Sequence, residues 1–302
     1  MYFYELFGLH LVSEIELPEL IAGDASQPPD LSIRCVATAR PVDGPTYADE
    51  TLACNARAFR LARPEADYLV EDGERILVAP MGEDLRTLRV YLLGSIMGAL
   101  CYQRGWLPMH ANAIELNGRA FLVCGDSGAG KSTLAAHFIR RGLRVAGDDV
   151  SAIDFAGGGP LARPGVPRVK LWADALDRLG LPKPPEARVL PEAEKYALPI
   201  FDQQARTPLP VRGIFILRDG KGGEAPRISP LYGAEAVDAL MANTYRASYP
   251  GGMGLQGAHF ARLAALAAAA PVFDLRRPWG SELLEPLVET LSAKMATLAS
   301  AP

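Results

Sequence analysis

Residues 119–149 read RAFLVCGDSGAGKSTLAAHFIRRGLRVAGDD, and this stretch decides the fold of the chain. The apolar run at 120–124 predicts a buried strand, and residues 131–141 predict a helix. Between them stands Gly125-Asp-Ser-Gly-Ala-Gly-Lys-Ser132, in which a glycine, four residues and then glycine, lysine and serine follow one another. The order of strand, glycine-rich loop and helix predicts a nucleotide-binding α/β domain.

The residue types of this loop suit phosphate binding. Glycines let the backbone curl so that successive N–H groups face phosphate oxygens, and the helix dipole adds positive potential. Lys131 is expected to reach the outer phosphates, and the Ser132 hydroxyl to ligate Mg²⁺. A glycine-rich turn without a ligand would explain neither residue. The predicted nucleotide-binding residues of the loop are Gly125, Asp126, Ser127, Gly128, Ala129, Gly130, Lys131, Ser132 and Thr133.

Two adjacent carboxylates, Asp148 and Asp149, end the next apolar segment, and Asp148 stands seventeen residues after Lys131. Neighbouring residues of an extended strand point to opposite sides, so both can face the phosphates only if the strand bends there. One carboxylate can then hold Mg²⁺ while the other accepts a proton from an attacking hydroxyl. A cap or turn without a catalytic role is the alternative, since aspartate is common in turns.

Four more charged or titratable residues are candidates. His110 is expected on the strand before the loop strand, because Asn117-Gly118 predicts a tight hairpin between them. It should therefore lie near the nucleotide. Further along, segments shaped by proline and glycine carry basic residues, which suit contacts with phosphate or an acidic substrate, although a solvated surface is the alternative. The basic residues assigned to nucleotide binding are Arg168, Lys170 and Lys195.

Residues 109–149, from MHANAIELNG to the double aspartate, resemble the catalytic core of bacterial HPr kinase/phosphorylase. The resemblance rests on a histidine twenty-one residues before the loop lysine, the GDSGxGKS loop, the RRG at the helix end and the double aspartate. It implies a serine kinase that uses ATP and Mg²⁺, with Asp148 as the catalytic base and His110 beside it. Ser132 and Asp149 are then expected to hold the metal.

The resemblance has limits and an extension. Thr133 stands where the family has glutamate, and the glutamate-containing IRG element has only a local likeness at residues 211–213. These departures leave open whether the phosphorolysis half of the family's activity follows. The opening FGLHLVSEIELPEL, at 7–20, is similar to HPr-kinase-like proteins associated with ribosomally made peptides, including lasso-peptide tailoring kinases. This second likeness implies a precursor peptide as the substrate.

The predicted fold is α/β, with a P-loop kinase domain of the HPr-kinase type at 81–302 and a small β-rich domain at 1–80 that recognises the substrate. Alternating runs around Asp72-Gly73 predict a hairpin in the first part, and apolar spacing predicts a helix over 82–104. Residues 1–85 hold 6 basic and 16 acidic side chains, whereas the rest hold 25 and 19. The first part should repel nucleic acid and acidic lipid, and the second suits an anionic ligand.

The remaining segments complete this picture. Strands are predicted at 213–217, 228–231 and 272–275, and helices at 234–241, 261–270 and 282–298, with a flexible loop at 250–254 as a cover for the site. The four cysteines form no CxxC pair, and the N-terminus lacks the features of a signal peptide. These observations predict reduced thiols and a cytoplasmic protein.

The predicted function is ATP-dependent transfer of the γ-phosphate to a Ser or Thr hydroxyl of a peptide, namely a lasso-type precursor. An HPr-type protein serine kinase, a small-metabolite kinase and a nucleotide-dependent regulatory ATPase are the alternatives. Neither nucleic acid nor membrane is an expected partner, and a homo-oligomer is left open. The sequence does not distinguish among these substrates.

Overall fold

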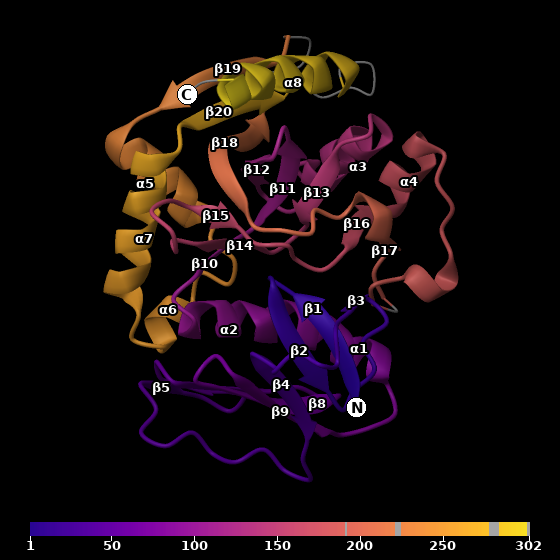
Figure 1. Cartoon of the computed structure of the whole chain (residues 1–302), viewed down its shortest axis with the longest axis vertical. Helices are drawn as coiled ribbons and strands as arrows, with labels where there is room; N and C mark the ends of the chain where they lie inside the picture. The colour runs from indigo at the N-terminus through magenta and orange to yellow at the C-terminus, as the bar shows by residue number, and fades with distance from the viewer. Residues whose placement is uncertain (191, 221–224, 278–283, 301–302) are drawn as a thin grey trace.

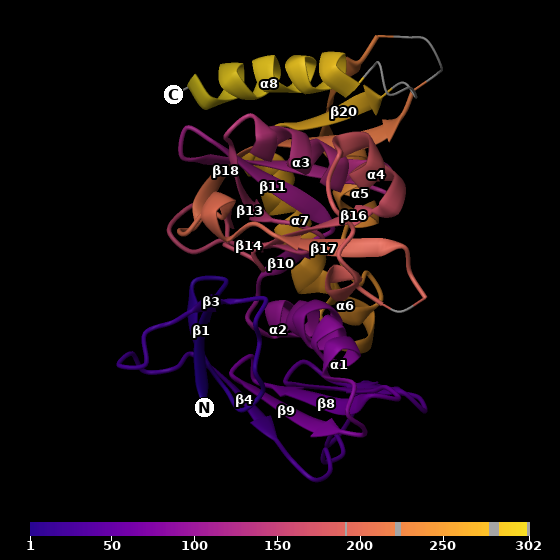
Figure 2. The same cartoon turned by 90° about the vertical axis from the view of Figure 1, so that its right-hand side faces the viewer.

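The computed structural model describes residues 1–190, 192–220, 225–277 and 284–300. It is an α/β protein with two nine-stranded sheets and a two-stranded ribbon. Figure 1 shows the N-terminal sheet at one end of the molecule and helix α8 (Leu284–Ser300) at the other. Figure 2 shows the second sheet and its helices stacked between these two ends.

The first sheet takes all its strands from residues 2–80. Its order is β3-β1-β2-β4-β9-β8-β7-β6-β5. Asp72 and Gly73, with φ of 53° and 68°, form the turn between β8 and β9, so the predicted hairpin is confirmed. The strands are β1 (Tyr2–Leu6), β2 (Leu9–Ser13), β3 (Ile21–Ala22), β4 (Leu31–Cys35), β5 (Tyr47–Ala48), β6 (Leu52–Cys54), β7 (Ala58–Ala62), β8 (Ala66–Glu71) and β9 (Arg75–Pro80).

A continuous helical segment covers one face of this sheet. It consists of α1 (Leu85–Tyr91), a π-helical turn η1 (Leu92–Ile96) and α2 (Met97–Gln103). The Asp84 carboxylate accepts the N–H of Thr87 at 3.0 Å and caps the segment. Its apolar face shares one core with the sheet, because Leu88, Ile96 and Leu100 pack among the side chains of β1, β4, β7 and β9. The predicted helix is therefore present, although Leu85, expected on the apolar face, is 45% exposed.

The second sheet holds the segment that decides the fold. Its order is β10-β14-β15-β18-β12-β11-β13, with β20 beside β18 and β19 beside β20. Strand β12 runs parallel to β18, and β18 runs parallel to β20, so the carboxyl ends of these three strands meet at one edge. The strands are β10 (Leu107–Met109), β11 (Ala111–Leu116), β12 (Arg119–Gly125), β13 (Arg144–Gly147), β14 (Ser151–Asp154), β15 (Leu161–Ala162), β18 (Leu209–Asp219), β19 (Arg227–Leu231) and β20 (Val272–Arg277).

Helices cover both faces of the second sheet. Alternate side chains of β11, β12, β18 and β20 point to opposite faces, which gives two separate cores. One face packs on α3 (Lys131–Arg140) and α8, and the other on α5 (Gly233–Ala242) and α7 (Gln256–Ala269). The strands and helices predicted within 213–275 are thus present with shifted ends, and the start of the predicted helix at 282–298 falls outside the described residues.

A small ribbon lies beside α3. It pairs β16 (Arg168–Trp172) with β17 (Lys195–Pro199), and helix α4 (Ala173–Leu179) follows β16 directly. Apolar side chains of the ribbon and α4 share a core with α3. Two short 3-10 turns, η2 (Pro185–Ala187) and η3 (Phe201–Gln203), flank β17. The ribbon thereby presents one face to the helix that follows the glycine-rich loop.

One predicted segment has a different structure. Residues 250–254, expected to form a flexible cover, lie largely in the helical turn α6 (Tyr249–Gly252). Tyr249 and Met253 are buried in the core of the N-terminal sheet, and the Phe59 and Tyr249 rings lie 4.5 Å apart. The prediction of a cover is wrong because these apolar side chains anchor the segment in that core.

The structure also bears on the thiols and on membrane insertion. All four cysteines are free, and only Cys35 is exposed. Among the described residues, no helix combines the length and apolar character that a membrane span requires.

Candidate active site

Loop 125–133 connects β12 to α3, as predicted. The backbone φ angles of Gly125, Gly128 and Gly130 are 148°, 88° and 100°, values that residues other than glycine rarely adopt. A Cβ on Gly130 would collide with the guanidinium of Arg277, which donates to the Ala129 carbonyl at 2.6 Å. Arg277 is the last residue of strand β20, so the end of that strand holds the loop in place through this hydrogen bond. The loop needs glycine for both backbone conformation and space.

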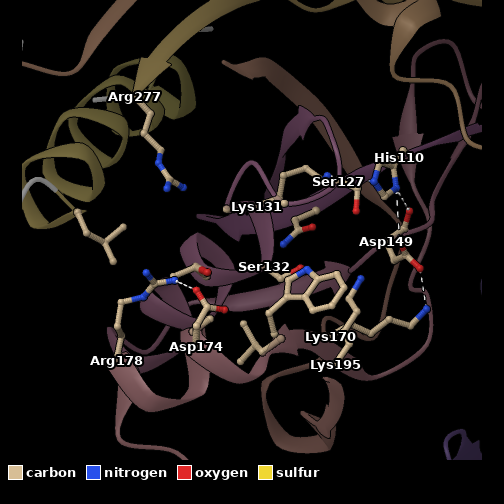
Figure 3. Close-up of a pocket in the computed structure, with 18 of the residues that line it drawn as sticks. His110, Ser127, Lys131, Ser132, Asp149, Lys170, Asp174, Arg178, Lys195 and Arg277 are labelled. Atoms are coloured by element: carbon tan, nitrogen blue, oxygen red, sulfur yellow. Dashed lines mark hydrogen bonds and ion pairs between the residues drawn. The ribbon is translucent and has the colours of Figure 1, made fainter. Parts of the chain in front are cut away.

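Lys131 is a buried cation held by the loop that precedes it. Its Nζ donates to the carbonyls of Gly125 and Asp126 at 2.7 and 3.0 Å and lies 3.0 Å from His110 Nε2. Burial lowers the pKa of Lys131. Figure 3 shows Lys131 and His110 on the same side of the cavity. The ammonium group is therefore placed before any ligand arrives.

His110 sits between β10 and β11, where its N–H donates to the Asn243 carbonyl at 2.8 Å. Its Nδ1 lies 3.0 Å from the Asp149 carbonyl and 3.4 Å from Asp149 Oδ1. Burial and the Lys131 ammonium lower the pKa of His110, and Asp149 only partly opposes them. A neutral ring with its proton on Nδ1 can donate to Asp149 and accept from Lys131 at Nε2.

The strand bends at the double aspartate, as its geometry requires. Asp149 has φ of 71°, just beyond the end of β13. Asp148 Oδ1 accepts the Ser132 hydroxyl at 2.9 Å, and Oδ2 accepts the backbone N–H of Lys170 at 2.7 Å. Asp149 Oδ2 accepts the Lys170 ammonium at 2.6 Å. The two carboxylates therefore have separate partners.

The same contacts shift the pKa values of the two carboxyl groups in opposite directions. Burial, and then the charge of Asp149, raise the pKa of Asp148. Burial is also the largest influence on Asp149, but Lys170, Lys195 and His110 together outweigh it and hold the pKa of Asp149 below its usual range. Asp149 consequently stays ionised to a lower pH than Asp148 does.

A cavity of about 500 Å³ joins the loop to the ribbon (Figure 3). Ser127, Lys131 and Asp149 are among its polar lining residues, and Trp172, with 42% of its surface exposed, lines it beneath the Lys195 ammonium. Of the basic residues predicted to bind the nucleotide, Lys170 and Lys195 line the cavity. Arg168 does not, although it shares their strand pair. The remaining predicted lining residues are His110, Gly128, Gly130, Ser132 and Thr133.

The sequence did not single out several residues that line this cavity, among them Asn112, Trp172, Arg178 and Arg277. Asn112 on β11 is fully buried, and neither its Nδ2 nor its Oδ1 has a hydrogen-bond partner among the described residues. One signal was available, because Asn112 is the polar residue in the apolar run MHANAI. The pairing of β20 with β18, which brings Arg277 to the loop, has no signature in the sequence.

The carboxylates and hydroxyl of the site determine whether it could hold a metal ion. Across the residues that the structure describes, no group of three or more His, Cys, Asp or Glu could hold a metal. Mg²⁺ usually keeps several waters and binds one or two carboxylates together with substrate phosphates. The hydroxyl of Ser132 and the carboxylate of Asp148, 2.9 Å apart, therefore fit a partial Mg²⁺ site that phosphate oxygens would complete.

Comparison with known proteins adds little. Neither the protein-family models nor the curated proteins contain a match to this chain. Among solved structures, the chain is similar to the HPr(Ser) kinase/phosphatase of Coxiella burnetii, with 18% identity and a TM-score of 0.33 over 63% of this chain and 98% of that one. A TM-score this low decides neither fold nor function, so both rest on the residues of the site.

Proposed function

We propose that this chain is a kinase that transfers the γ-phosphoryl group of ATP to a serine or threonine hydroxyl. One observation carries the proposal: the glycine-rich loop with Lys131 shares a cavity with a second carboxylate, Asp149, which Lys170 and His110 hold in place. A module that only binds nucleotide needs the loop, the lysine and a metal-side carboxylate. The additional, ion-paired carboxylate is what phosphoryl transfer to a hydroxyl requires.

The residues of the cavity fit a nucleoside triphosphate. The loop offers backbone N–H groups and Lys131, and the face of Trp172 offers an aromatic surface in the same cavity. Asn112 also lines it and supplies an amide donor and acceptor that have no partner among the described residues. An unpartnered buried amide costs about 1–3 kcal/mol, so its retention beside the loop supports a bound ligand that satisfies it.

The contacts lead us to exchange the predicted roles of the two aspartates. The sequence assigned the proton to Asp148 and the metal to Asp149. Ser132, the other expected Mg²⁺ ligand, contacts Asp148, whereas His110 contacts Asp149 and only Asp149 lines the cavity. The raised pKa of Asp148 favours the original order, but a proton acceptor must first reach the substrate hydroxyl. We therefore assign the metal side to Ser132 and Asp148, and the hydroxyl to Asp149.

The remaining residues prepare the site for transfer. When bound, ATP with Mg²⁺ supplies the phosphoryl group and part of the charge neutralisation. Lys131 and Arg277 place positive charge at the loop, and Lys170 fixes the orientation of the Asp149 carboxylate. His110 donates to Asp149 and keeps its side chain from turning away. Because phosphoryl transfer depends mainly on positioning, a carboxylate of low pKa can still orient the hydroxyl and accept its proton late.

The acceptor is proposed from the sequence likeness at 7–20, which points to a precursor peptide of the lasso type. An HPr-type protein serine kinase shares the same site chemistry and is the second candidate. A regulatory ATPase would hydrolyse ATP without any acceptor. The acidic N-terminal sheet domain is proposed to contact the acceptor, since Phe7 of this domain exchanges hydrogen bonds with Arg163 and Pro164 in the segment that leads into β16.

One experiment separates these functions. The full chain is incubated with γ-labelled ATP and Mg²⁺ and either a lasso-type precursor peptide or HPr, and phosphoserine or phosphothreonine is mapped by mass spectrometry. Label in the peptide supports the proposal, and label in HPr alone moves the assignment to the protein kinase. Release of inorganic phosphate with no labelled acceptor favours the ATPase. The Lys131→Ala variant is the control, because it should lose every one of these activities.

A further inference from the structure

Arg168 is a buried cation that has no partner in the part of the chain that the structure describes. Its side chain begins strand β16 and only 8% of the residue is exposed. Among the described residues, the guanidinium makes no hydrogen bond and no ion pair, although its backbone N–H bonds to the Val166 carbonyl at 2.8 Å. A buried guanidinium is normally paired, because the desolvation of its charge is costly. The exception points to a ligand.

The position of Arg168 relates it to the reacting groups. Arg168 and Lys170 lie two residues apart on one strand and so point to the same face of the ribbon. Lys170 holds Asp149 at 2.6 Å, and two residues of a strand span about 7 Å. An anion on Arg168 would therefore lie within the length of about two amino-acid residues from the carboxylate that faces the hydroxyl.

A buried acceptor from the N-terminal sheet domain lies in the same neighbourhood. Glu19 Oε1 accepts from Arg89 at 2.8 Å, but its Oε2 is buried and has no partner among the described residues. Glu19 is the charge that most strongly favours the protonated Arg168, ahead of Asp149 and Asp148. The loop before β16 also touches this domain, since Arg163 Nη1 donates to the Phe7 carbonyl at 2.8 Å. The guanidinium of Arg168 and the carboxylate of Glu19 thus lie in the region where the N-terminal sheet domain contacts the segment before β16.

Building on the proposed kinase function, we propose that Arg168 anchors a carboxylate of the acceptor substrate, carried by the hydroxyl-bearing residue itself or by its immediate neighbour. The planar guanidinium matches a carboxylate with two parallel hydrogen bonds. Glu19 Oε2 accepts an N–H of the same substrate unit. The site therefore recognises an amino-acid unit that carries a carboxylate and an N–H group close together.

The surrounding charges favour a carboxylate over a phosphate. The Lys170 ammonium already has a carboxylate partner, and Lys131 is held by the loop carbonyls. Arg168 forms no ion pair among the described residues, so one added negative charge would pair it. A doubly charged phosphate would also face Glu19 and Asp149, whose like charges oppose it. Arg168, first predicted to bind the nucleotide, is thereby reassigned to the acceptor.

Binding of small probes tests the proposal without knowledge of the natural substrate. Ligand-observed NMR on the full chain compares N-acetyl-L-serine with N-acetyl-L-serinamide, and N-acetyl-seryl-aspartamide with N-acetyl-seryl-asparaginamide. The first pair carries or lacks the residue's own carboxylate, and the second carries or lacks a neighbouring one. We expect one acid to bind roughly ten- to a hundredfold tighter than its neutral twin, as for a charge-assisted hydrogen bond. The pair that shows this preference identifies the source of the carboxylate.

Variants then assign the preference to Arg168. Arg168→Gln should abolish it, and Arg168→Lys, which keeps the charge but loses the fork, should retain only part of it. Arg206→Gln is the matched control, because Arg206 is exposed and its guanidinium donates to the Phe201 carbonyl in its own turn. Melting curves of each variant confirm that it is folded.

Three results would overturn the inference. The first is equal binding of acid and amide in both pairs. The second is a preference for the acid that survives in Arg168→Gln. The third is displacement of the bound acid by inorganic phosphate at a lower concentration than that of the acid itself. ATP binding is titrated in parallel on the same samples. Loss of nucleotide binding with an intact carboxylate preference would refute the kinase and leave the anchor standing, so the two failures are distinguishable.

Discussion

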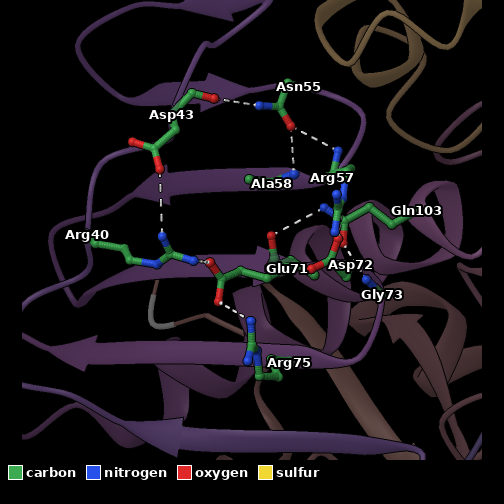
Figure 4. A network of polar contacts seen from close by, with 11 residues as sticks. Arg40, Asp43, Asn55, Arg57, Ala58, Glu71, Asp72, Gly73, Arg75 and Gln103 are labelled. Atoms are coloured by element: carbon green, nitrogen blue, oxygen red, sulfur yellow. Dashed lines mark hydrogen bonds and ion pairs between the residues drawn. The ribbon is translucent and has the colours of Figure 1, made fainter.

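Charged and polar side chains on the two large sheets of this protein differ in the partners they have. On the first sheet, ionic side chains pair with one another, as in the network in Figure 4, where the exposed Arg40 and Arg75 both contact the buried Glu71. At the edge of the second sheet, Lys131 and Asp149 are held in crowded contacts, and Asn112 has no partner among the described residues. The charges of the first network satisfy one another, whereas the groups of the second fit the proposal that a ligand completes them.

The two groups of side chains also contribute differently to the stability of the free protein. The Arg57–Asp72 pair spans 2.7 Å, but the Arg57 side chain is 82% exposed, and such pairs contribute little to stability. A buried group without a partner lowers the stability of the free protein. Natural folds tolerate such groups mainly at functional sites. The comparison therefore predicts that substitutions of polar groups at the edge of the second sheet change activity. Substitutions of exposed, ion-paired residues on the first sheet should change neither activity nor stability appreciably.

The largest expected effect is at the loop lysine. Lys131→Ala should abolish phosphoryl transfer while the fold stays intact, because the loop carbonyls it contacts can bind water instead. Transfer is measured as labelled acceptor, and the fold by circular dichroism. A folded Lys131→Ala protein with wild-type turnover would contradict the role of the loop.

The next effect separates the two aspartates. Asp149→Asn keeps the shape but cannot accept a proton, so kcat should fall by roughly 10²–10⁴ at any Mg²⁺ concentration. Asp148→Asn loses a charged group beside Ser132, so more Mg²⁺ should be needed for half-maximal rate. Rates are measured across a Mg²⁺ titration. Rescue of Asp149→Asn, but not of Asp148→Asn, by excess Mg²⁺ would restore the order first predicted.

A smaller effect is expected at Asn112. Replacement by alanine should weaken the binding of ATP with Mg²⁺ by roughly tenfold, as for the loss of one or two hydrogen bonds to a charged ligand. The melting temperature of the free protein should stay level, because the amide has no partner to lose. Calorimetric titration and thermal melts give both values. A strong fall in melting temperature with unchanged affinity would show that Asn112 is structural.

The smallest effect is expected on the first sheet. Arg57→Ala removes the exposed pair with Asp72 and should leave the melting temperature and the phosphoryl-transfer rate at their wild-type values. Arg168→Gln is the informative counterpart, because it removes an unpaired buried cation and should not lower the melting temperature. If Arg57→Ala destabilises the protein more than Arg168→Gln does, the contrast between the two sheets fails.

The sequence predicted those features that are encoded locally. The strand, loop and helix around Lys131 follow from periodicity and glycine spacing, and the Asp72-Gly73 turn follows from turn chemistry. The bend at the double aspartate was anticipated because adjacent strand residues face opposite ways.

What the sequence did not predict depends on contacts between distant segments. The partners of Asp148 and Asp149 are set by the ribbon that brings Lys170 alongside them, twenty-two and twenty-one residues later. Arg277 reaches the loop from 148 residues beyond Ala129. Residues 250–254 were misread because their glycines suggest mobility, whereas burial of Tyr249 and Met253 in a distant core fixes them.

The helical segment of α1, η1 and α2 has a consequence for how this protein can be divided. Its apolar face belongs to the core of the first sheet, although it follows the last strand of that sheet in the chain. A cut after residue 80 would leave Leu88, Ile96 and Leu100 uncovered on the C-terminal fragment, which should then aggregate. A cut after Gly105, which has φ of 73° and ends the segment, keeps sheet and helix together. Exchange of the recognition part, in the laboratory or in evolution, would have to move residues 1–105 together and keep a partner for the face that Tyr249 and Met253 cover.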